Sequence, residues 1–241
     1  MSTAFHPNAH PHLPAVDTVF VSTEGVLFYV NSAVALKTCR NAFREFLGSC
    51  LSDPKFRHTW APVPVDVQSA EFNVILHLLY GTSPASHSPS FEVLQNAVDC
   101  MPRYSIVPCE YIVPGSPLYT LLLSVAPLQP MDVYTLAAHH KLHDLAMATS
   151  SHLLSYPLRN ITEAQAERMG AIYLKKLMDL HLSRLSALKT ILLSPPNPHS
   201  PTCRCSFQEQ RKLTRAWALA SAYIVWDSRL GMSYYLIVWT L

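Results

Sequence analysis

The segment 17–37 constrains the fold of this chain more than any other. Apolar residues alternate with others over residues 19–22 and again over residues 26–30, and Glu24–Gly25 lies between the two runs. An alternation with a period of two predicts strands, and a glycine between two such runs predicts a hairpin. Apolar residues within 33–37 then follow at helical spacing. The segment therefore predicts a β-hairpin that leads directly into a helix.

The following residues predict one more strand and a succession of helices. Val63, Val65 and Val67 alternate with other residues, and Pro64 suits a strand at the edge of a sheet because proline has no N–H to donate. Further on, apolar residues recur at helical spacing in stretches that proline and glycine separate. These stretches are 72–79, 91–101, 133–140 and 145–153.

This order of elements, together with several local motifs, resembles the BTB/POZ family of interaction domains. Asp17-Thr-Val-Phe-Val and Gly25-Val-Leu-Phe-Tyr-Val-Asn31 are similar to its first two strands. Phe43-Arg-Glu-Phe-Leu and Phe72-Asn-Val-Ile-Leu-His-Leu-Leu-Tyr-Gly81 are similar to two of its helices. The proline-rich loops most resemble a divergent fungal (basidiomycete-type) branch of the family.

The resemblance covers about residues 16–155 and implies an α+β fold. We expect a disordered His/Pro-rich tail at 1–14 and then a BTB/POZ-like domain at 15–157, in which a three-stranded sheet meets a helical cluster. An all-α C-terminal extension at 158–241 is expected to follow.

Two features depart from the family pattern. Asn31 stands where the family usually has His, so it is open whether the hydrogen bond of that His has a counterpart here. The segment 104–130 is an insertion that could occlude a groove used by other members. Its apolar part predicts a short buried helix at 117–126, because prolines cut the segment well below the roughly 20 apolar residues that a membrane-spanning helix needs.

The resemblance also implies self-association. Family members pair through the surfaces of the hairpin and the first helix. Five large apolar side chains here exceed what one small hairpin face is expected to bury, and we expect them at the interface of an isologous homodimer. They are Val19, Phe20, Phe28, Leu36 and Phe43. The expected function is thus a non-enzymatic interaction module that serves as a scaffold or adaptor.

Some family members recruit cullin scaffolds as ubiquitin-ligase adaptors, which makes a cullin a candidate partner. The family's cullin contacts use the helix equivalent to 69–80 and the segment after it. Residues 81–89 are polar and offer no apolar anchor of the kind that interface hot spots need. The sequence therefore leaves the adaptor role open.

Residues 158–241 predict helices. Thr162 and Gln165 are spaced as a capping box at a helix start. Six residues then follow in steps of four and three, which predicts a helix with one face toward a core. They are Leu174, Met178, His181, Leu185, Leu188 and Leu192. The prolines within 195–198 end this helix, and a last helix is expected at 208–226.

His199, Cys203 and Cys205 are the first candidate metal ligands, because imidazole and thiolates suit zinc. Cys-x-Cys lacks the usual two-residue gap and no fourth ligand is evident, so a loop with free thiols is the competing interpretation. A metal here would support the alternative function, a helical regulatory or scaffold protein with a structural metal site. No other cofactor is expected.

The second candidate is the group His139, His140 and His143, of which His139 and His143 are four residues apart. On one helix this spacing places both side chains on the same face. Partly exposed helix histidines are the competing interpretation.

Composition and motifs argue against several classes of function. The formal net charge of +2 is too small to favour nucleic acid or an anionic membrane. Six glycines leave little room for phosphate-binding loops, and no Gly-x-Ser-x-Gly occurs, so no enzyme is expected. Charged residues make up 14%, against roughly 25% in typical domains, which favours a surface that binds other proteins.

The six cysteines lie in mostly apolar surroundings, and no signal-peptide pattern precedes them. Reduced thiols, and hence an intracellular protein of the cytoplasm or nucleus, are expected.

Overall fold

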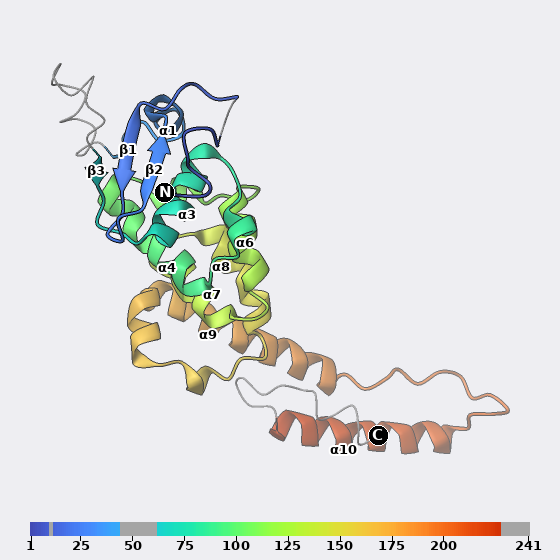
Figure 1. Cartoon of the computed structure of the whole chain (residues 1–241). Helices are drawn as coiled ribbons and strands as arrows, with labels where there is room; N and C mark the ends of the chain where they lie inside the picture. Colours follow the sequence, from blue (N-terminus) through green and yellow to red (C-terminus); the bar gives the residue numbers. More distant parts are fainter. Residues whose placement is uncertain (10–11, 44–61, 228–241) are drawn as a thin grey trace. The chain divides into compact units, whose positions relative to one another are not determined.

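The computed structural model describes residues 1–9, 12–43 and 62–227 (Figure 1). The chain divides into two compact units, Met1–Thr149 (unit 1) and Ser150–Leu241 (unit 2), whereas the sequence suggested a boundary after residue 157. Unit 1 combines a small sheet with several helices, and unit 2 contains two long helices. The predicted α+β class is therefore confirmed.

The sheet of unit 1 is mixed and has the strand order β2-β1-β3. β1 (Thr18–Val21) pairs antiparallel with β2 (Leu27–Val30), as the hairpin pattern predicted. Gly25 takes a positive φ of 74° in the turn between them, a conformation that glycine adopts without steric cost. β3 (Val63–Pro64) pairs parallel with β1 at the edge of the sheet.

Residues 1–9 lie along β2 on the side away from β1. Ser2 N donates to Leu27 O at 2.8 Å, and Tyr29 N donates to Phe5 O at 2.9 Å. Phe5 is fully buried, and its ring meets Tyr80 edge-on at 5.2 Å between centroids. The structure thus differs from the disordered tail that composition suggested, because a single aromatic side chain anchors a segment otherwise rich in His and Pro.

Helices make up most of the rest of unit 1. In chain order they are α1 (Ser32–Thr38), α3 (Ser69–Tyr80), α4 (Phe91–Cys100), α5 (Pro108–Tyr111), α6 (Pro117–Val125), α7 (Pro130–His139) and α8 (His143–Ser150). The short helix predicted at 117–126 is confirmed as α6, with Ser116 as its N-cap and Pro117 at its first position. The helix expected to begin near Phe43 extends into residues 44–47, which lie outside the described residues.

The core of unit 1 is an aromatic cluster between the sheet and α3. Phe72 lies at its centre, with ring centroids 5.0 Å from Phe28, 5.5 Å from Phe20 and 5.8 Å from Phe43. All four side chains are at most 1% exposed. Each such pair adds about 0.5–1.5 kcal/mol beyond the burial of its area. The cluster fixes which face of the hairpin points inward.

Unit 2 is built on α9 (Glu163–Leu193) and α10 (Phe207–Asp227). The predicted capping box is confirmed: Gln165 N donates to Thr162 Oγ1 and Thr162 N donates to Gln165 Oε1, both at 3.2 Å. Gly170, with φ of 74°, kinks α9 near its start. Trp217 Nε1 of α10 donates to Leu192 O of α9 at 2.9 Å.

The apolar stripe predicted on α9 is only partly buried. Leu177 and His181 are 1% and 2% exposed, whereas Met178, which the spacing had included, is 44% exposed. One residue of the predicted face is therefore replaced by its neighbour.

Candidate interaction surface

Four of the five side chains expected at a dimer interface are buried in unit 1. Phe20, Phe28 and Phe43 lie in the aromatic cluster on the inner side of the sheet, and Val19, which is on the outer side, is 5% exposed. Leu36 in α1 is half-buried. The hairpin buries more than a small face suggested, because α3 covers its inner side. Apolar side chains that a partner could reach therefore have to be sought on the outer side of the sheet.

The outer face of the hairpin is also apolar. Val19 pairs with Tyr29, and Val21 pairs with Leu27, whereas Phe20 pairs with Phe28 on the inner face. Because side chains alternate between the faces of a sheet, these two outer pairs share one side. Val21, Leu27 and Tyr29 are half-buried, so part of each remains accessible.

A groove of about 390 Å³ follows this outer face. Apolar and aromatic side chains from the hairpin line it, together with prolines from other segments. The lining residues are Pro7, Val16, Val19, Leu27, Tyr29 and Pro62. A concave, mainly apolar surface of this kind is typical of a contact with another protein.

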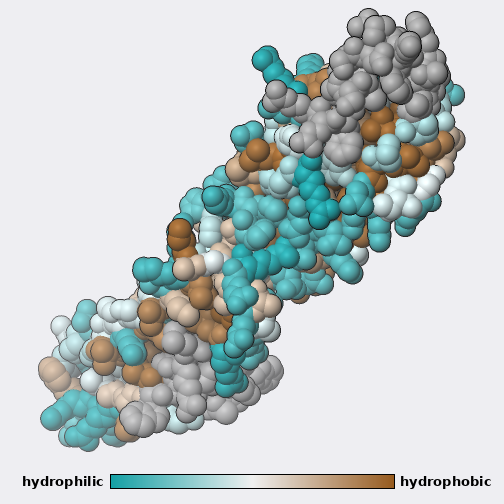
Figure 2. Space-filling view, turned by 90° about the vertical axis from the view of Figure 1, so that its left-hand side faces the viewer, coloured by the Kyte–Doolittle hydropathy of each residue, from teal (hydrophilic) through white to brown (hydrophobic). Residues whose placement is uncertain are grey.

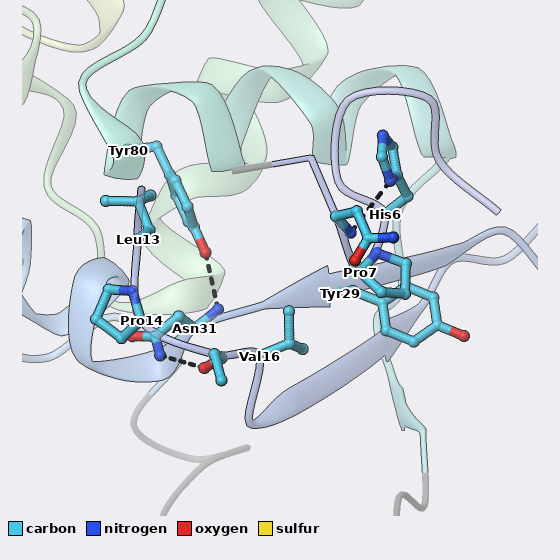
Figure 3. A pocket seen from close by; sticks show the side chains of 10 residues that line it. His6, Pro7, Leu13, Pro14, Val16, Tyr29, Asn31 and Tyr80 are labelled. Atoms are coloured by element: carbon cyan, nitrogen blue, oxygen red, sulfur yellow. Dashed lines mark hydrogen bonds between the residues drawn. The ribbon is translucent and has the colours of Figure 1, made fainter. Parts of the chain in front are cut away.

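A second pocket, of about 250 Å³, lies beside the groove between the N-terminal segment and the end of β2 (Figure 3). Pro7, Val16 and Tyr29 line both spaces. Figure 3 shows Tyr80 reaching from α3 with its hydroxyl toward Asn31. The two hollows are therefore neighbours that share these three side chains as part of their walls.

Asn31 organises the polar end of this pocket. Its backbone N donates to Tyr80 Oη at 2.8 Å, its Nδ2 donates to Ala15 O at 2.6 Å, and its Oδ1 accepts from Val34 N at 3.0 Å as the N-cap of α1. Burial raises the pKa of Tyr80 above its ordinary value, so the phenol stays neutral. Asn31 therefore joins the end of β2, α1, α3 and the segment before β1 through hydrogen bonds. The sequence singled out Asn31 and included Tyr80 in the motif 72–81, but it did not connect the two residues and gave no signal for Phe5.

His199, Cys203 and Cys205 are not brought together as metal ligands. His199 Nδ1 lies 2.7 Å from Ser200 O, and Thr202 and Cys205 form a tight turn through reciprocal backbone hydrogen bonds. In the described ranges the one group of three or more potential ligands is Asp99, His139 and His140. The metal-site alternative for the C-terminal region therefore has no geometric support.

The four-residue spacing of His139 and His143 does not place them on one helix. α7 ends at His139, and Lys141 adopts a positive φ of 59°. Leu142 N donates to Ala137 O and Lys141 N donates to Ala138 O, which is a Schellman motif. The chain turns there, and α8 starts anew at His143. His140 instead contacts Asp99 of α4, with Nε2 2.6 Å from Oδ1.

The surface of the molecule is mixed in polarity. Hydrophobic side chains interrupt the hydrophilic surface in separate patches on the face that Figure 2 shows. This agrees with the low fraction of charged residues. Among the helices in the described ranges, none has both the length and the apolar character required to cross a membrane.

Comparison with known proteins gives no relative: no family model, curated protein or solved structure matches the chain.

Proposed function

We propose that the chain is a non-enzymatic, intracellular protein–protein interaction module of the BTB/POZ type, which pairs with a second copy of itself. The sequence motifs of the hairpin and of α3 support the family. The resemblance implies two strands, two helices, a third strand and successive helices, and the described residues follow this order except for the second helix, whose place falls within residues 44–61 outside the described ranges.

The apolar outer face of the hairpin is the observation that carries this proposal. Val19, Leu27 and Tyr29 line a groove of about 390 Å³ on the side of the sheet opposite the aromatic core. A stable dimer buries about 800 Å² on each partner around a central apolar or aromatic anchor. Tyr29 is suited to be that anchor, because it is large and half-buried and lines both hollows.

A twofold pairing brings this face against the same face of the second copy, so each anchor residue acts twice. Substitution of one outer-face residue therefore removes two contacts in the dimer. Residues 81–89 are mostly polar, and Pro84 among them is buried. They therefore offer a cullin no anchor comparable with Tyr29. The proposal is thus a self-associating scaffold.

Light scattering behind a sizing column tests the pairing. At micromolar concentration the wild-type chain should have twice its mass of 27.0 kDa. Tyr29→Asp places two carboxylates in the apolar contact and should give the single-chain mass. The matched control is Leu182→Asp on α9, where the side chain is 53% exposed and far along the sequence from the groove.

A wild-type protein of 27.0 kDa would contradict the proposal. A dimer that withstands Tyr29→Asp, or that Leu182→Asp dissociates equally well, would place the contact elsewhere. Circular dichroism of each variant checks that the fold persists.

A further inference from the structure

We propose that Asp99, His139 and His140 form a binding site for a divalent transition-metal ion, with Zn²⁺ as the best match. The site is independent of the proposed pairing surface. It lies where α4 and α7 end, and no motif in the sequence connects its two parts.

The donor set is the first argument. Each of the three side chains offers one ligand atom, and all three atoms lie within 4.8 Å of one another. Two imidazole nitrogens with one carboxylate oxygen are a ligand set that Zn²⁺ accepts, with water in the fourth position of a tetrahedron. Calcium and magnesium prefer oxygen ligands alone, so the two nitrogens favour a transition metal.

The distances are compatible with small side-chain movements. His140 Nε2 and Asp99 Oδ1 are 2.6 Å apart, as hydrogen-bond partners. Zinc bonds of about 2.0–2.2 Å place tetrahedral ligand atoms about 3.3–3.5 Å from each other. Binding must therefore spread the pair by less than an ångström and draw His139 inward.

The position of the side chains favours a cation. His139 is the last residue of α7 and His140 is its C-cap, where the helix dipole presents its negative end. Asp99 is in the last turn of α4, where a carboxylate is unfavourable unless a positive charge lies beside it. A bound divalent ion satisfies both helix ends at once.

Burial divides the roles of the two histidines. The His140 side chain is 9% exposed and that of Asp99 is 30% exposed, so their geometry is held by the surrounding protein. His139 is exposed, and its ring meets that of His140 edge to face, with centroids 4.8 Å apart. His139 is thus the ligand on the solvent side, from which an ion and its water would enter.

Isothermal titration of Zn²⁺ into the full chain tests the site with three proteins: the wild type, His139→Ala and His143→Ala. Both histidines are exposed, so neither substitution removes a core contact. The wild type and His143→Ala should bind one ion more than His139→Ala, or bind it at least about 10-fold more tightly, since even loss of an outer-sphere partner weakens a metal site that much. Other histidines and thiols are common to all three proteins, so only the difference between variants counts.

Two further measurements separate a metal site from a hydrogen bond that only holds α4 to α7. Co²⁺ bound at this site should give a four-coordinate visible spectrum without a thiolate charge-transfer band, and Asp99→Asn should abolish it while the circular dichroism is retained. Zn²⁺ should also raise the melting temperature of the wild type and of His143→Ala but not of His139→Ala. Absence of saturable Zn²⁺ binding by the wild type, or equal binding by His139→Ala and His143→Ala, would overturn the proposal.

Discussion

Unit 1 and unit 2 are both rich in apolar residues, yet they use them differently. Unit 1 packs large side chains around Phe72 until most are fully buried. In the described part of unit 2 the buried apolar side chains are Leu153, Met169 and Leu177, whereas Leu193 and Leu219 are 73% and 74% exposed. The difference teaches that helical periodicity predicts a helix but does not guarantee a core. A core also needs a second layer at the right distance, which the sheet provides in unit 1.

Separation of the units should have the largest effect. We expect residues 1–149 alone to unfold in one cooperative thermal transition, because their core is complete within the fragment. Residues 150–241 alone should keep helical circular dichroism but lose it gradually on heating, since small cores rarely supply more than about 3–5 kcal/mol. A sharp thermal transition in the second fragment, or none in the first, would contradict this difference between the cores of the two units.

The same substitution, Phe to Ala, in each unit tests the difference in packing between them. Phe72→Ala should lower the free energy of unfolding of unit 1 by about 3–5 kcal/mol, because it leaves a cavity at the centre of the aromatic cluster. Phe207→Ala in α10 removes a side chain that is 64% exposed and should change stability by about 0.5 kcal/mol or less. Denaturant titration of the two full-length variants measures both values. Similar losses would mean that Phe207 has a packing role comparable with that of Phe72.

The smallest of the three effects concerns pH and a single group in unit 2. Burial lowers the pKa of His181 below its ordinary 6.5, against a hydrogen bond with the Leu153 backbone, and the nearby charge of Arg184 adds to the lowering. At pH values between the lowered folded-state pKa of His181 and 6.5, this histidine binds more protons in the unfolded chain than in the folded one. Stability from neutral His181 is therefore complete above about pH 6.5 and is lost as the pH falls through the folded-state pKa.

The helical circular dichroism of the fragment 150–241 should accordingly decrease when the pH is lowered from neutral to mildly acidic values. His181→Gln keeps a polar side chain that does not titrate in this range, and should reduce the dependence on pH. An unchanged pH profile in His181→Gln would assign the effect to other groups.

Local patterns were sufficient to predict several elements. The hairpin, the α6 helix between prolines and the capping box at Thr162 each depend on residues close together in sequence. The alternation in the hairpin also showed that it has two faces. It did not show which face meets a helix, so Phe20 and Phe28 of the inner face were expected at the dimer interface together with Val19 of the outer face.

The parts that sequence reasoning missed depend on long-range contacts or on one backbone angle. Asp99 and His140 are 41 residues apart in the chain, so no spacing rule connects them. The left-handed conformation of Lys141 ends α7 and cancels the spacing of His139 and His143. Residues 1–9 looked unstructured by composition, although Phe5 alone provides a buried anchor.

The N-terminal segment covers one edge of the sheet and so limits how the sheet can be extended. A strand at the edge of a sheet offers unpaired backbone groups, on which another chain can add a strand. Here the backbone groups of Ser2 and Phe5 form hydrogen bonds with Leu27 O and Tyr29 N at one edge. Pro64 in β3 has no N–H to donate at the other edge. Growth of the sheet by backbone pairing is thereby opposed at both sides, so the proposed pairing with a second copy would have to use side chains and not backbone groups.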